Sequence, residues 1–248
     1  MTALKPELLP KATVAVLDKL ADEEALTGFC LVGGTAMALQ AGHRRSLDVV
    51  DLVIFEESLN KHALFKAMQA RGATLVTPAS MISAAKINGL DLLAHAQDYV
   101  LDGVEVQCFA EAQGRRYAAG VQSQPGWRFG LADLPTLFAM KSALLLKRSR
   151  SRDYFDLMWF CQHQGKTMAD IMAAAQAADD GPEVPTLVEH KLLGLLPLDA
   201  DDEGLDPVDV GTTVANIYAY FEGLVQAQEI AQARDLIASR REIQGDAE

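Results

Sequence analysis

The sequence has little cysteine and no long apolar run, and these scarcities argue against several classes of protein. Its 248 residues include three cysteines, Cys30, Cys108 and Cys161, which form no C-x-x-C pair and no zinc-like group with histidine. This argues against a disulfide-stapled secreted domain. No segment approaches the ~20 apolar residues that a membrane-spanning helix needs. Charges and prolines interrupt residues 1–21, unlike a signal peptide. We therefore expect a cytoplasmic protein without a membrane partner.

Basic residues are also scarce relative to acidic ones. Lys plus Arg is 22 and Asp plus Glu is 34, so the formal net charge is 22 − 34 = −12. Non-specific binding of DNA or RNA depends on neutralising phosphates, so we expect no general DNA binding. A local basic site can still bind a nucleotide or the end of an RNA. Half of the residues are apolar, which is enough to bury a core. The length of 248 residues suits one large domain or two small ones.

The apolar pattern divides the chain into two regions. Apolar runs predict strands at Phe29–Val32, residues 47–55 and Val104–Phe109, with shorter strand-like pieces near residues 74–76, 83–87 and 90–93. Beyond a loop signal at residues 123–126 the spacing is almost wholly helical. We therefore predict an α+β protein with an α/β domain over residues 1–122 and a helical domain over residues 123–248. Five acidic residues in the segment 199–206 predict a solvated loop.

A paired glycine follows the first predicted strand. Gly33 and Gly34 lead into a helix for which Thr35 is the expected N-cap and Gly42 the end. The unpaired N–H groups at such a helix start favour an anion such as a phosphate. The alternative is that Gly-Gly serves only close packing of the turn. The segment is no P-loop, because no Gly-Lys-Ser/Thr follows.

Two carboxylates stand in the second predicted strand. Asp48 and Asp51 follow a basic pair, Arg44 and Arg45, and carboxylates in a buried strand are costly unless they are paired or bind metal. Two carboxylates that hold magnesium ions, with substrate phosphates completing the shell, would explain them. The alternative is that Asp48 lies in water at the strand mouth and pairs with one of the arginines, which would contribute little.

A third cluster combines basic and acidic residues. Lys141 precedes the basic segment 147–152, and cations suit the C-terminus of a helix. That explanation does not extend to Arg152, which stands beside Asp153. Asp153 and Asp156 are three residues apart and share a helical face. One of them can orient an arginine that holds a phosphate.

In this order the three clusters resemble the AbiEii/AbiGii toxin family of nucleotidyltransferases. The matching segments are GGTAMAL at residues 33–39, HRRSLD at 43–48, and Lys141 followed by RDYFD at 152–156. The resemblance implies a polymerase-β-like nucleotidyltransferase domain with a mixed sheet. It also implies Mg2+ or Mn2+ as cofactor and transfer of a nucleotide from an NTP to a hydroxyl acceptor, such as tRNA. A cognate antitoxin protein would be a partner.

The resemblance also implies roles for individual residues. The residues expected to bind the nucleotide are Gly33, Gly34, Thr35, Arg44, Ser46, Arg152 and Asp156. Those expected in catalysis are Asp48, Asp51, Lys141 and Asp153. The expected metal ligands are Asp48, Asp51 and, from the strand at residues 104–109, Glu105.

The chain departs from the family pattern at the metal ligands. The family has Asp-x-Asp, whereas two residues separate Asp48 from Asp51. Strand side chains alternate between faces, so a regular strand puts Val50 in the place of the second ligand. A β-bulge at Val49–Val50 would swing Asp51 back. On the later strand, neutral Gln107 shares a face with Glu105.

These departures leave two alternatives to the toxin-type enzyme. One is a catalytically weak or inactive relative that acts by binding nucleotide or protein. The other is a small-molecule nucleotidyltransferase, whose acceptor would be a sugar hydroxyl.

Overall fold

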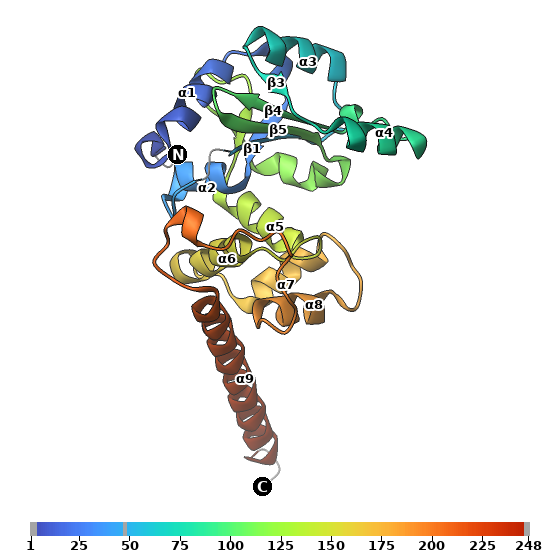
Figure 1. Ribbon diagram of the computed structural model, residues 1–248. Coiled ribbons are helices and arrows are strands. Elements are labelled where there is room, and N and C mark those ends of the chain that lie inside the picture. The colour runs from blue at the N-terminus through green and yellow to red at the C-terminus, as the bar shows by residue number, and fades with distance from the viewer. Residues whose placement is uncertain (1–3, 47–48, 246–248) are drawn as a thin grey trace. The chain divides into compact units, whose positions relative to one another are not determined.

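The protein is built around one mixed β-sheet. The computed structural model describes the backbone of residues 4–46 and 49–245, and side chains within 4–46 and 49–230. Within the described residues, seven strands lie in the order β3-β4-β5-β2-β1-β7-β6, and β1, β3, β4 and β5 are labelled in Figure 1. Their bounds are β1 Phe29–Val32, β2 Val49–Ile54, β3 Thr74–Leu75, β4 Ala96–Leu101, β5 Val104–Ala110, β6 Val121–Ser123 and β7 Gly130–Ala132. The mixed sheet and the helices that follow it confirm the α+β prediction.

Helices flank and follow the sheet. The α-helices are α1 Lys11–Leu20, α2 Gly33–Ala41, α3 Lys61–Ala70, α4 Ala79–Ile87, α5 Leu134–Leu144, α6 Ser151–Gln164, α7 Met168–Gln176, α8 Val184–Leu192 and α9 Val214–Gly245. Short 3-10 helices span Pro6–Leu8, Glu24–Leu26, Leu92–Ala94, Ala112–Gly120 and Asp206–Val208. As predicted, Gly42 ends α2 in the left-handed conformation. The side chain of Asn60 caps α3.

The two faces of the central strands differ in polarity. β2 pairs antiparallel with β1 and parallel with β5, and the side chains alternate along each strand. On one face Val50 and Leu52 of β2 are fully buried, and so is Val106 of β5. Helix α1 packs against both strands. The opposite face carries Asp51 and Gln107, and it is the face that concerns the site below.

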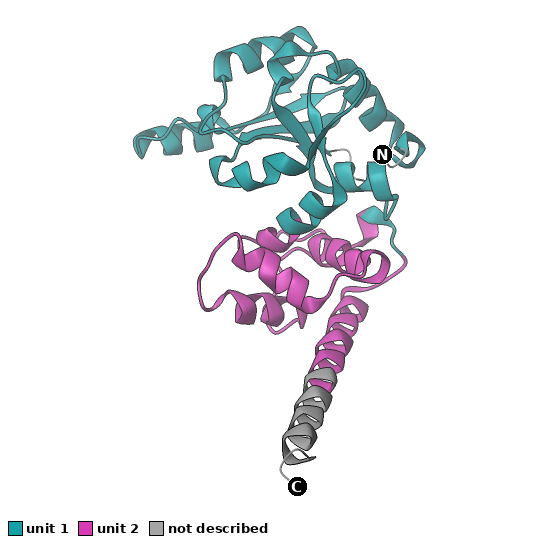
Figure 2. Ribbon diagram, turned by 180° about the vertical axis from the view of Figure 1, so that it is seen from behind, with its two compact units in different colours: residues 1–140, 208–210 teal, residues 141–207, 211–248 magenta. Residues whose placement is uncertain are grey.

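The chain forms two compact units (Figure 2). Unit 1 comprises Met1–Met140 with Val208–Val210, and unit 2 comprises Lys141–Pro207 with Gly211–Glu248. Residues 123–140, which the sequence analysis grouped with the helical region, have their contacts in unit 1. The reason is that β7 pairs with β1, and the buried Gln40 amide donates to the carbonyl oxygen of Ala132.

Several local predictions were wrong. Residues 83–87 belong to helix α4 rather than to a strand, residues 90–91 have no regular secondary structure, and residues 92–93 lie in a 3-10 helix. Strands β4, β6 and β7 were not predicted. Helix α4 has no buried residue, and its Met81 and Ile87 are exposed. Apolar residues therefore indicated a strand where the chain forms an exposed helix.

The three cysteines are free and buried, as expected of small apolar side chains. Burial raises the pKa of Cys30 to about 12, so its thiol stays protonated at neutral pH. Among the described residues, no helix is both long and apolar enough to cross a lipid bilayer.

Candidate active site

The glycine turn brings a carboxylate and a guanidinium to the start of α2. Gly33 adopts a φ of +72°, and the helix begins there. A methyl group on Gly33 would overlap Oδ2 of Asp51 and approach its Cγ to 3.0 Å. A methyl group on Gly34 would lie 2.8 Å from Nη2 of Arg44. Glycine therefore lets an acidic and a basic side chain lie directly against a helix N-terminus.

Thr35 has a different local role from the one predicted. The N-cap of α2 is Val32, so Thr35 lies inside the helix and the N-cap prediction was wrong. Its hydroxyl oxygen lies 2.6 Å from Oγ of Ser46, and it donates to the carbonyl oxygen of Val49 at 2.5 Å. Both hydroxyl-bearing residues are buried. Thr35 and Ser46 thus fasten the segment before β2 to helix α2.

The strand register places Asp51 beside the glycine turn. Asp51 pairs with Val32 of β1 on one side and with Gln107 of β5 on the other. The ladder between β2 and β5 is one-to-one from Val49 to Ile54, so a bulge at Val49–Val50 is absent from these paired residues. Val50 faces the core, and Val49 is the residue that shares the face of Asp51. Asp48 lies outside the described residues.

Glu105 lies on the same face, diagonal to Asp51. Its register partner is Val49, and its Oε1 accepts a hydrogen bond of 2.6 Å from the amide of Gln107. The predicted common face of Glu105 and Gln107 is confirmed. Asp98 of β4 is the register partner of Gln107. Burial raises the pKa of Asp98 and the charge of Glu105 adds to this effect, while a hydrogen bond from Thr77 opposes it.

The polar face offers oxygen donors for a hard divalent cation. Mg2+ is typically held by one or two carboxylates and substrate phosphates rather than by a full protein cage. Asp51 and Glu105 are carboxylates of that kind on one face, and they fit such a role. Within residues 4–46 and 49–230, no three His, Cys, Asp or Glu side chains converge on one point.

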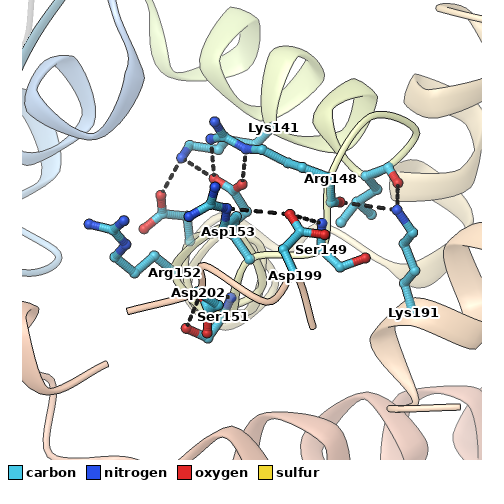
Figure 3. Close-up of polar contacts among 12 residues, drawn as sticks. Lys141, Arg148, Ser149, Ser151, Arg152, Asp153, Lys191, Asp199 and Asp202 are labelled. Atoms are coloured by element: carbon cyan, nitrogen blue, oxygen red, sulfur yellow. Dashed lines mark hydrogen bonds and ion pairs between the residues drawn. The ribbon is translucent and has the colours of Figure 1, made fainter. Parts of the chain in front are cut away.

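In unit 2, the predicted catalytic residues form a buried ion cluster (Figure 3). The ammonium of Lys141 lies 2.6 Å from Oδ1 of Asp153 and 2.8 Å from Oδ2 of Asp156. Arg148 donates to both oxygens of Asp153, at 2.7 and 3.1 Å. The side chains of Lys141 and Asp153 are 6% and 3% exposed. The two carboxylates three residues apart therefore share one helical face, as predicted, and orient Lys141.

The buried cluster predicts a stability that depends on pH. Burial alone would raise the pKa of Asp153, but Lys141 and Arg148 together hold it below its ordinary value. A carboxyl with a lower pKa in the folded state stabilises the fold fully above its unfolded pKa, near 4, and this contribution is lost as the pH falls through the folded pKa. We expect urea unfolding between pH 7 and pH 3 to show this loss. A wild-type acid dependence identical to that of Asp153→Asn would contradict it.

Arg150 and Arg152 are bound by the acidic segment 199–203. Arg150 donates to Oδ2 of Asp201 at 2.6 Å, and Nη2 of Arg152 lies 3.1 Å from Oε2 of Glu203. The segment is a loop with exposed Asp201 and Glu203 side chains, as predicted, but it also pairs with these arginines. The five acids at 199–206 and the arginines at 148–152 are complementary in charge, and this signal in the sequence could have indicated their pairing.

Sequence reasoning also missed Lys191. Its buried ammonium donates to the carbonyl oxygens of Leu145 and Arg148, at 2.5 and 3.1 Å, just after α5 ends. Burial lowers the pKa of Lys191, and Asp199 opposes this shift. Lys191 therefore fixes the chain that connects α5 to the arginines.

The glycine turn predicts a sharp difference between two adjacent substitutions. We expect Gly33→Ala to destabilise unit 1 by about 2–3 kcal/mol, because it combines a strained left-handed φ with overlap against Asp51. Gly34→Ala is the matched control: only the flexible end of Arg44 must move, so we expect a change within about 1 kcal/mol. Thermal and urea denaturation measure both. Equal effects would contradict the described geometry.

The chain is similar to a known protein family and to solved structures. The family model described as "Nucleotidyl transferase AbiEii toxin, Type IV TA system" matches residues 15–209. A solved candidate nucleotidyltransferase of Helicobacter pylori is 15% identical, with 87% of this chain and 92% of that chain covered and a TM-score of 0.49. JHP933 of H. pylori is 13% identical, with 94% and 99% covered and a TM-score of 0.49. Comparison with curated proteins gave no match.

Proposed function

Because the chain belongs to the AbiEii nucleotidyl transferase toxin family, we propose that it transfers a nucleotide from an NTP to a hydroxyl acceptor, with tRNA as the leading candidate. The cofactor in this proposal is Mg2+ or Mn2+, and a cognate antitoxin is the expected protein partner. The acidic chain favours a small acceptor, or one recognised locally at an RNA end, over extended contact with nucleic acid.

One observation carries the proposal: Asp51 and Arg44 lie against the paired glycines at the start of α2. A helix N-terminus and a guanidinium both attract phosphate oxygens. A carboxylate beside them is the group that a phosphate-bound divalent cation requires. Gly33 and Gly34 keep side-chain atoms out of the approach to the backbone N–H groups.

In the proposed reaction, the acceptor oxygen bonds to the α-phosphorus, pyrophosphate leaves and the hydroxyl proton passes to water. The helix start and Arg44 bind the phosphates. Asp51, with Glu105 on the same face, would hold the cation, which neutralises negative charge when bound. In unit 2, Arg152 is the proposed phosphate-binding residue, while Asp153 and Asp156 are positioning residues for Lys141.

The second candidate is a nucleotide-binding protein with little transferase activity. It is favoured by Gln107, the neutral register partner of Asp51 on the polar face. An amide is a weaker cation ligand than a carboxylate, and here it also donates to Glu105. Nucleotide binding without transfer to any acceptor would support this candidate.

The direct test incubates the full chain with each α-labelled NTP, Mg2+ or Mn2+, and total tRNA. We expect label to appear on tRNA, to disappear with excess EDTA and to return when the cation is added back. A sugar-hydroxyl aminoglycoside in place of tRNA tests the small-molecule alternative. Failure of every NTP to label any acceptor, with NTP binding intact, would overturn transfer in favour of the second candidate.

A further inference from the structure

Four carboxylates of one segment converge on the start of α6. This acidic segment, residues 199–203, lies across Ser149–Arg152 (Figure 3). The backbone N–H of Ser149 donates to Oδ2 of Asp199 at 3.0 Å. The backbone N–H and the hydroxyl of Ser151 both donate to Oδ1 of Asp202, at 3.1 Å each.

These carboxylates accept from donors of the kind that also bind phosphate oxygens. Arg150, the N-cap residue, makes no capping bond with its own side chain, and Asp202 supplies the negative charge at the helix N-terminus instead. Backbone N–H groups, a hydroxyl and guanidinium groups are also the donors that proteins use for phosphate oxygens. The acidic segment therefore satisfies donors that suit a polyphosphate.

The ion pairs around the start of α6 differ in how readily an outside anion can replace the carboxylate. Asp153 holds Lys141 and Arg148 from a buried position. By contrast, the Glu203 side chain that meets Arg152 is 60% exposed. An exposed ion pair contributes little to stability and competes with solvent ions. The Arg152 side chain is only 19% exposed, so its guanidinium needs another anion when the exposed Glu203 carboxylate leaves.

We propose that Glu203 is a built-in competitor of polyphosphate for Arg152. In the free chain Glu203 binds the guanidinium, and a nucleotide triphosphate binds Arg152 by displacing it. The contact lowers the affinity for nucleotide and favours ligands with enough negative charge to replace a carboxylate. This inference rests on the proposed function, in which Arg152 holds phosphate.

The test is calorimetric binding of ATP and of inorganic tripolyphosphate to the full chain. We expect Glu203→Gln to tighten binding of both ligands by roughly two- to fivefold, the range that an exposed ion pair allows. Asp201→Asn is the matched control, since it removes the same charge from the same segment. Its partner Arg150 stays bound to the carbonyl oxygen of Asp201 and lies 3.3 Å from Asp199, so we expect less than about half of that gain.

Further variants separate competition from a general effect of charge. In an Arg152→Gln background, Glu203→Gln should give no gain in affinity. Equal gains from Glu203→Gln and Asp201→Asn, or a loss of affinity in Glu203→Gln, would overturn the proposal. Label transfer shows which of the two proposals fails. If the wild type transfers label but Glu203→Gln leaves the affinity unchanged, the competition by Glu203 is refuted and the transferase function stands. If Glu203→Gln binds tripolyphosphate more tightly but no label is transferred, the competition by Glu203 is supported and the transferase function is refuted.

Discussion

Asp51→Asn is expected to reduce the rate of label transfer by about a hundredfold to a thousandfold while leaving the fold intact. The amide has the same shape as the carboxylate and fits against Gly33, so packing around the turn is retained. The lost charge is the one that the proposed cation requires, and removing such an electrostatic contribution costs about 3–4 kcal/mol in the transition state. Initial rates of transfer at saturating NTP and cation measure the effect.

The matched control for this substitution lies on the same face of the sheet. Asp98→Asn removes a carboxylate from β4, where Thr77 is its hydrogen-bond partner. Gln107 separates Asp98 from Asp51 in the register. We expect Asp98→Asn to change the transfer rate by less than about threefold, because Asp98 lies one strand further than Gln107 from Asp51 and its carboxylate has Thr77 as a partner. Wild-type rates in Asp51→Asn would remove Asp51 from the mechanism.

Asp153→Asn is expected to destabilise unit 2 by about 3 kcal/mol or more. The substitution removes one of the two carboxylates that lie within 2.8 Å of the buried Lys141 ammonium, and breaking one side of a buried ion cluster is far more costly than losing an exposed pair. The contribution of Arg148 is smaller, since its side chain is 43% exposed. Urea denaturation followed by circular dichroism measures the free energy of unfolding.

Glu203→Gln provides the comparison within the same unit. It also removes one carboxylate from an ion pair with an arginine, but that carboxylate is 60% exposed. We expect a change below about 1 kcal/mol. If Asp153→Asn were no more destabilising than Glu203→Gln, the buried cluster would not stabilise the unit as its geometry indicates.

Local patterns predicted the part of the fold that depends on neighbours in sequence. The apolar run before Gly33 indicated β1, and the alternation along β5 indicated the shared face of Glu105 and Gln107. These signals are local because strand periodicity and glycine conformations are set within a few residues. The face of Asp51 followed in the same way, since Val50 faces the core.

The contacts that were missed join distant segments. Nothing near Ser151 in the sequence indicates that Asp202 will bind its backbone N–H, and nothing near α5 indicates Lys191. The strand prediction for residues 83–87 failed for another reason. The apolar residues indicated a strand, whereas the segment belongs to a helix that lies at the surface. Sequence pattern reports the hydrophobicity of a segment, but the sheet and its covering helices decide which apolar segment is buried.

The capping of α6 by Asp202 spans 51 residues of sequence. During synthesis, the start of α6 leaves the ribosome well before its capping carboxylate does. The arginines of this region therefore cannot reach their final partners until the segment 199–203 has also left the ribosome. For a protein of a toxin family, this order of assembly delays a finished unit 2 until that segment has been made.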